Sequence, residues 1–149
     1  MRAALVIAAF ALAACTQPGA PAQTPPPAPQ SDLVQRINAD LARLDVELAA
    51  EGIVAVGIGE TADLGDGLTV RPIDVKEDSR CPANVDCVWA GQLVLRADVS
   101  GTEREITLGT PLETPQGTVL LAVAKPYPFN EWPTAELPIP PYRFGFRRG

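Results

Sequence analysis

The chain has 149 residues, with 16 prolines, 12 glycines, no histidine and a formal net charge of −6. This length suits a single domain, and the acidic balance argues against a nucleic-acid partner, because phosphates would repel such a surface. Without histidine, the usual nucleophile–histidine catalytic sites are excluded.

The first 14 residues have the pattern of a bacterial lipoprotein signal peptide. Arg2 precedes an apolar run over residues 3–14, which is too short for a permanent transmembrane helix. The run ends in Leu-Ala-Ala-Cys, which resembles signals in which the cysteine, here Cys15, receives diacylglycerol and becomes the first residue of the mature protein. An ordinary signal peptide with an incidental cysteine is the alternative. Cleavage leaves eleven Lys and Arg against eighteen Asp and Glu, a net charge of −7.

Residues 15–30 predict a lipidated, disordered tether. Six prolines and no charged residue occur in residues 16–30, and such segments extend by roughly 3.1 Å per residue, or up to about 45 Å here. We expect the chain to be an envelope protein held by this lipid on the periplasmic face of the outer membrane. Thr16 follows the lipid site, and the absence of Asp at this position favours the outer membrane by resemblance to known lipoprotein sorting.

An amphipathic helix is predicted in residues 31–52. Apolar residues recur at steps of three and four, Ser31 or Asp32 can cap its start, and Gly52 stands where it would stop. The helix either docks on the following domain or pairs with a second copy as a short coiled coil, and docking is favoured because there are fewer than three heptads. The apolar stripe consists of Val34, Ile37, Leu41, Leu44 and Leu48.

Residues 53–149 predict a β-domain of about six short strands, a small antiparallel sandwich or barrel. Pro72 lacks a backbone donor and places its strand at an edge or beside a bulge. Residues 117–128 are the most apolar and predict a central strand, whereas residues 142–148 are expected to close the sheet. The predicted strands occupy residues 53–60, 68–78, 88–101, 104–109, 117–128 and 142–148.

Cys81 and Cys87 enclose five residues in a loop between two predicted strands. With Cys15 taken by lipid, these two form a pair, and exported proteins meet an oxidising compartment in which pairs become disulfides. Pro82 and Asn84 supply turn chemistry. Two residues after Cys87, Trp89 would share a strand face with it and shield the sulfur atoms.

Other readings of the cysteine pair are weaker. Structural zinc needs about four Cys or His ligands, and redox centres favour Cys-x-x-Cys at the start of a helix. A calcium site from Asp78, Asn84 and Asp86 lacks the dense oxygen pattern of a calcium loop. Unpaired thiols are the remaining alternative. We therefore expect no metal and no cofactor.

Residues 77–91, EDSRCPANVDCVWAG, resemble the signature of a family of bacterial lipoproteins and exported proteins: Asp-Ser-Arg-Cys-Pro, a short gap, then Cys, Trp and Ala-Gly. The resemblance covers about residues 53–148, with KPYP at 125–128 and YRFGF at 142–146 as weaker matches. It implies a body of short strands, and it brings no activity, substrate or cofactor. The helix at 32–50 lies outside it. The motif residues expected to be structural are Asp78, Arg80, Pro82, Trp89 and Gly91.

Two side chains in this region have both a structural and a functional reading. Arg80 would form a forked contact with Asp78 or Asp86, or would bind an anionic ligand. Trp132 lies in a proline-rich connection and would either contact a partner or fold back onto the sheet.

No catalytic constellation is recognisable, although paired carboxylates for sugar hydrolysis remain conceivable. We expect a non-catalytic domain that presents a surface to an envelope protein partner. The alternative is a small-molecule or metal-binding module, which a pocket lined by converging polar groups would favour. Thiol–disulfide exchange would require an accessible sulfur atom in the cysteine pair.

Overall fold

The computed structural model describes residues 31–149, so the expected signal peptide, Cys15 and the tether lie outside the described residues. The fold class predicted from the sequence is confirmed: the domain consists of two four-stranded antiparallel sheets and one helix. No helix in residues 31–149 is long and apolar enough to span a membrane.

The helix α1, Asp32–Leu48, begins where the sequence indicates. The Ser31 hydroxyl oxygen accepts a hydrogen bond from the backbone N–H of Val34 at 3.4 Å, and so caps the first turn. The helix ends at Leu48 with Ala49 as its C-cap, and Gly52 has a φ of +77°, a conformation that glycine adopts without steric cost.

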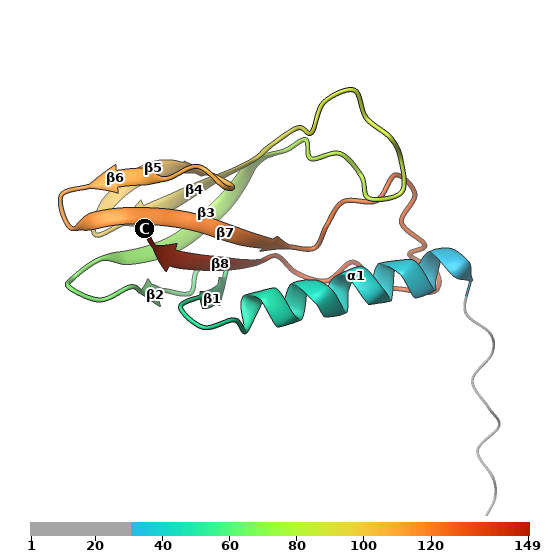
Figure 1. Cartoon of the computed structure of the whole chain (residues 1–149), viewed down its shortest axis with the longest axis horizontal. Coiled ribbons are helices and arrows are strands. Elements are labelled where there is room, and N and C mark those ends of the chain that lie inside the picture. Colours follow the sequence, from blue (N-terminus) through green and yellow to red (C-terminus); the bar gives the residue numbers. More distant parts are fainter. Residues whose placement is uncertain (1–30) are drawn as a thin grey trace, which may run out of the picture.

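The apolar stripe of α1 seats the helix on the β-domain, as predicted, in preference to a coiled coil. Val34, Ile37, Leu44 and Leu48 are buried, and the last two pack against Val123. A Cβ at Gly145 would lie 3.1 Å from a methyl carbon of Leu48 and 2.8 Å from one of Ile53. Glycine at this position therefore leaves room for the helix and its connection to approach the sheet (Figure 1).

The first sheet has the order β1-β8-β7-β6 and the second has the order β2-β3-β4-β5. All pairs described between neighbouring strands are antiparallel. The strands are β1 Val54–Gly57, β2 Ala62–Asp63, β3 Thr69–Asp78, β4 Leu93–Val99, β5 Thr102–Thr107, β6 Leu112–Thr114, β7 Gly117–Lys125 and β8 Arg143–Arg148.

The core lies between the sheets, where alternate residues of each strand point inward. Leu93, Leu95, Ala97 and Val99 of β4 are all buried, as their alternation predicts. From the opposite sheet, Phe144 and Phe146 of β8 are fully buried among them, as are Val119 and Leu121 of β7.

Three details of the sheets differ from the prediction. The short strands β2 and β6 were not predicted, because two or three residues show no clear alternation. β8 lies between β1 and β7, so it is an interior strand and does not close the sheet at an edge. β4 begins at Leu93 and not near residue 88, which leaves residues 79–92 as a long connection.

Pro72 and β7 behave as expected. The register of β3 against β4 shifts between Pro72 and Asp74, which is the predicted bulge. β7 is interior, with β6 on one side and β8 on the other.

Candidate binding loop

The connection between β3 and β4, residues 79–92, extends from one end of the sandwich (Figure 1). Its two arms are joined close to the sheet. The backbone N–H of Ser79 donates to the carbonyl of Gln92 at 2.8 Å, and that of Cys81 donates to the carbonyl of Ala90 at 2.8 Å. We call residues 79–92 the binding loop.

Gly91 is required for the two arms to approach each other. A Cβ there would lie 1.7 Å from the carbonyl oxygen of Ser79, and the φ of +67° favours glycine in any case. The structural role expected for Gly91 therefore has a specific cause, a backbone contact that no side chain permits.

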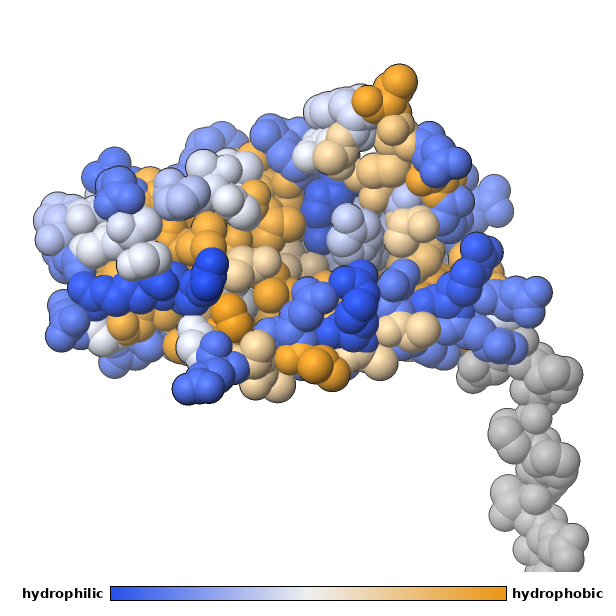
Figure 2. Space-filling view, viewed as in Figure 1, coloured by the Kyte–Doolittle hydropathy of each residue, from blue (hydrophilic) through white to orange (hydrophobic). Residues whose placement is uncertain are grey.

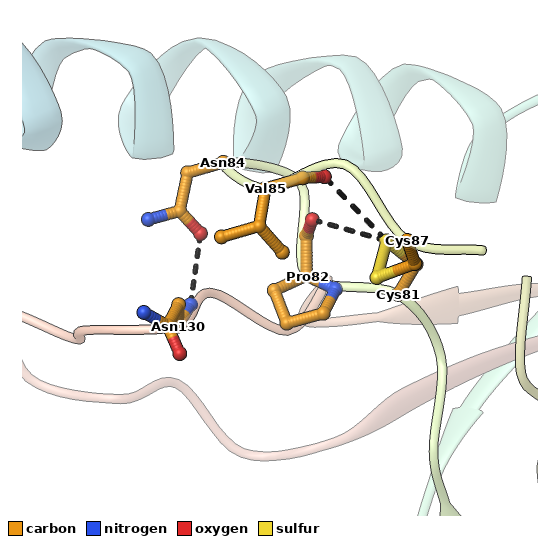
Figure 3. Close-up of a disulfide and its surroundings, with 6 residues drawn as sticks. All are labelled: Cys81, Pro82, Asn84, Val85, Cys87 and Asn130. Atoms are coloured by element: carbon orange, nitrogen blue, oxygen red, sulfur yellow. Dashed lines mark hydrogen bonds between the residues drawn. A yellow bond between two sulfur atoms is a disulfide. The ribbon is translucent and has the colours of Figure 1, made fainter. Parts of the chain in front are cut away.

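The predicted disulfide joins Cys81 to Cys87, with the two Cα atoms 5.9 Å apart. Inside the ring, the Cys81 sulfur lies 3.6 Å from the carbonyl oxygen of Pro82 and 3.5 Å from that of Val85 (Figure 3). The ring thus folds its own backbone around one sulfur atom. It closes the outer part of the loop and does not join two strands directly, since both cysteines lie outside the sheets.

The loop is also fixed to the chain that follows β7. The N–H of Ala83 donates to the carbonyl of Pro128 at 2.9 Å, and the Asn84 side-chain oxygen accepts from the N–H of Asn130 at 2.8 Å (Figure 3). Asn84 is therefore occupied by the backbone, and no group of three or more His, Cys, Asp or Glu side chains in residues 31–149 is arranged to hold a metal ion.

Arg80 anchors the base of the loop. Its side chain is 5% exposed and forms the predicted fork with Asp78, through Nε to Oδ1 and Nη2 to Oδ2, each at 2.7 Å. Nη1 donates to the carbonyl of Ala124 at 3.0 Å, and Nη2 donates to that of Pro126 at 2.7 Å. Of the two readings of Arg80, the buried structural contact is the one observed, because four of its five N–H donors are hydrogen-bonded within the domain and the side chain is enclosed.

Two tyrosines complete this anchor. The Tyr142 hydroxyl donates to Asp78 Oδ2 at 2.8 Å, and the Arg80 guanidinium lies 5.2 Å from the centre of the Tyr127 ring. The sequence predicts neither contact. KPYP and YRFGF match a family pattern only weakly, and nothing in their spacing indicates that both aromatic side chains meet one arginine.

The electrostatics of the anchor follow from this geometry. Burial by itself raises the pKa of Asp78, but the hydrogen bonds from Arg80 and Tyr142 and the arginine charge outweigh burial and lower it. For Tyr142, burial and the hydrogen bond to Asp78 raise the pKa to about 12. The carboxylate thus stays ionised and the phenol stays protonated over the neutral pH range.

The outer end of the loop differs sharply from its base, and here one prediction is wrong. Trp89 is 67% exposed and does not shield the disulfide, because residues 88–92 are not part of β4 and the alternation of a strand does not apply to them. Val88 is fully exposed and Val85 is 39% exposed. We call Val85, Val88 and Trp89 the apolar tip; Figure 2 shows apolar side chains at this end of the molecule.

Trp89 does not cover the disulfide, and Cys87 is exposed to solvent. The accessible sulfur atom that thiol–disulfide exchange requires is therefore present. A reactive thiolate also needs a neighbouring cation. Arg80, the cation nearest in sequence, is committed to Asp78.

Trp132 folds back onto its own connection between β7 and β8, whereas the sequence left open a partner contact or packing on the sheet. Its indole N–H donates to the carbonyl of Leu137 at 2.9 Å, and its ring meets Phe129 edge to face at 5.7 Å. The side chain is half-buried, so the exposed tryptophan of the domain is Trp89.

Residues 31–149 carry surface hollows of different sizes. One of about 90 Å³ lies between residues 99–104 and 114–116, and it is smaller than small-molecule sites, which usually measure about 300–1,000 Å³. Another, beside the first turns of α1, measures about 610 Å³ but is wide open to solvent; it is lined by Asp32, Gln35, Arg36 and Ala39. Neither hollow is lined by residues of the motif.

Comparison with known proteins adds no assignment: no family model, no curated protein and no solved structure matches this chain.

Proposed function

We propose that this protein is a lipid-anchored lipoprotein of the bacterial envelope, and that its non-catalytic β-domain binds a protein partner through the apolar tip. The observation that carries the proposal is the exposure of Val88 and Trp89 on a loop that is fixed at its base. The other motif residues have structural tasks, whereas these two side chains are not used by the fold.

The tip is well suited to binding because it is held in place. The disulfide, the Arg80–Asp78 fork and the contacts of residues 83–84 with residues 128–130 fix its backbone before any partner arrives. Preorganisation lowers the entropic cost of association. For comparison, each flexible side chain that must be ordered on binding costs about 0.5–1.5 kcal/mol. Tryptophan is also enriched among the residues that dominate binding energy at interfaces.

A protein partner fits this tip better than a lipid surface does. The exposed acidic residue Asp86 lies next to Val85 of the tip in the chain, and the mature chain would carry a net charge of −7, so anionic headgroups would repel it. A small-molecule ligand is the alternative function; the larger hollow is open to solvent and neither hollow is lined by the motif residues, which counts against it.

Cross-linking from the tip in the native envelope tests the proposal. A photoreactive amino acid replaces Val88 in one strain and Val46, which is 73% exposed on α1, in the control strain. We expect a discrete protein adduct from position 88, lost when Trp89→Ser is added, and none of that size from position 46. Equal adduct patterns from both positions, or adducts unaffected by Trp89→Ser, would contradict a partner site at the tip.

The anchor is tested separately. Cys15→Ala should release the protein from membranes and abolish labelling by radioactive palmitate. Persistent labelling in this variant would refute lipidation at Cys15, and fractionation of the labelled parent protein would show whether the outer membrane holds it, as we propose. Neither result depends on the tip.

A further inference from the structure

Residues 137–141, Leu-Pro-Ile-Pro-Pro, form a second exposed feature whose conformation the sequence restricts strongly. Each proline fixes φ near −65°. Leu137, Ile139 and Pro140 each precede a proline, which disfavours the helical region and leaves extended conformations. The segment belongs to no strand or helix of the described chain, and these restrictions favour the extended polyproline II conformation.

The burial of these residues has the period of that helix. A polyproline II helix has three residues per turn, so positions three apart lie on one edge. Leu137 and Pro140 are half-buried, whereas Pro138 and Pro141 are exposed. Ile139, on the third edge, is 59% exposed, although it is a large apolar side chain. One edge therefore faces the domain and two edges face solvent.

The segment is held at both ends. At its start, the Leu137 carbonyl accepts from the Trp132 indole and the Leu137 N–H donates to the carbonyl of Pro133 at 2.8 Å. At its end, Tyr142 is tied to Asp78 and β8 begins at Arg143. Between these points, residues 138–141 form no backbone–backbone hydrogen bond within the described chain.

We infer that Pro138–Pro141 is a preformed polyproline II ligand for an aromatic-lined groove on a protein partner. Such grooves accept proline edges between aromatic rings, and the low conformational entropy of the segment reduces the cost of binding. Here the prolines at 138 and 141 form one ridge and Ile139 adds an apolar contact beside it. This inference is independent of the apolar tip, since it rests on different residues and a different mode of recognition.

The test uses the full-length protein in its native envelope, with a photoreactive amino acid in place of Ile139. The competitor is a synthetic peptide of residues 135–143, AELPIPPYR, and the control peptide carries alanine at 138 and 141. We expect a discrete protein adduct whose yield falls about tenfold with the competitor and is unchanged by the control peptide. Mass spectrometry of the adduct should place the attachment within a surface that bears at least two Trp, Tyr or Phe side chains.

A matched pair of variants separates recognition from folding. Pro138→Ala with Pro141→Ala should abolish the adduct, whereas Pro111→Ala with Pro115→Ala, which removes two exposed prolines elsewhere, should not. Thermal unfolding of both variants is measured in parallel. An adduct that survives the first pair, an attachment to lipid, or an attachment site without aromatic side chains would each overturn the inference, as would failure to form any adduct from position 139.

Discussion

Arg80 and Asp78 form a two-bond fork at the base of the binding loop, with both donor–acceptor distances at 2.7 Å and the arginine side chain 5% exposed. Removing one partner of such a buried pair is costly, because the other charge remains without compensation. The fork also reaches the carbonyls of Ala124 and Pro126, so it connects the loop to the opposite sheet.

Arg80→Met should therefore destabilise the domain by about 3–5 kcal/mol, measured by urea unfolding of the 31–149 domain. The control is Arg96→Met, which removes an exposed fork to Asp74 and should cost at most about 1 kcal/mol. Similar losses in both variants would show that the Arg80 fork contributes no more than a surface ion pair.

Gly91→Ala should be far more damaging than other alanine substitutions at glycines with positive φ. The new Cβ would meet the Ser79 carbonyl at 1.7 Å, so the two arms of the loop must separate. Gly101→Ala is the matched control, because its φ is +84° but nothing lies within 4 Å of the added carbon. Thermal unfolding should show a small shift for Gly101→Ala and a large one for Gly91→Ala; equal shifts would mean that only the backbone angle matters.

The disulfide ring is short, so its contribution should be moderate. For a closed loop of about seven residues, the chain-entropy relation gives about 2.4 kcal/mol. The double variant Cys81→Ser, Cys87→Ser should lose about this much unfolding free energy, and dithiothreitol should lower the melting temperature of the parent but not of the variant. Identical melting of the parent with and without reductant would contradict a stabilising disulfide.

Alkaline pH should weaken the anchor through Tyr142. Its pKa in the folded state is about 12, above the ordinary value of 10.0 that applies to the unfolded chain. The folded state thus holds this proton more tightly, so the associated stability is complete below pH 10 and is lost as pH rises towards 12. Tyr142→Phe should remove this part of the pH dependence, measured as unfolding free energy from pH 9 to pH 12. An unchanged slope in that variant would assign the effect to other groups.

Asp78 should make the free energy of unfolding fall at acid pH, whereas Tyr142 makes it fall at alkaline pH. Its pKa is lowered in the folded state, so the stability from its ionised form is present above the unfolded pKa of about 3.9 and is lost as pH falls through the folded value. The parent should therefore lose more stability in this acid range than Asp78→Asn does, measured as unfolding free energy between pH 5 and pH 2. Parallel curves for the two proteins would contradict this role for the carboxylate.

Much of the architecture was determined by local sequence. The three- and four-residue spacing of apolar residues defines α1, and apolar residues at every second position define the inward face of β4, because both follow from the geometry of one element. The disulfide could be predicted from the expectation that the chain is exported and that its two remaining cysteines pair. A fork from Arg80 to Asp78, two positions before it, was one of the two contacts expected, the other being with Asp86. Each of these correct predictions depends on residues that lie close together in the chain.

Only the tertiary structure decided the rest. Tyr127 and Tyr142 meet the Arg80–Asp78 pair from segments far along the chain, and β8 becomes an interior strand because β1 pairs with its free edge. Trp89 was expected beside the sulfur atoms, but Gly91 and the late start of β4 turn the loop away from the sheet and leave the indole in solvent. A local pattern records how neighbours along the chain are spaced, whereas burial depends on which distant segments arrive to cover a side chain.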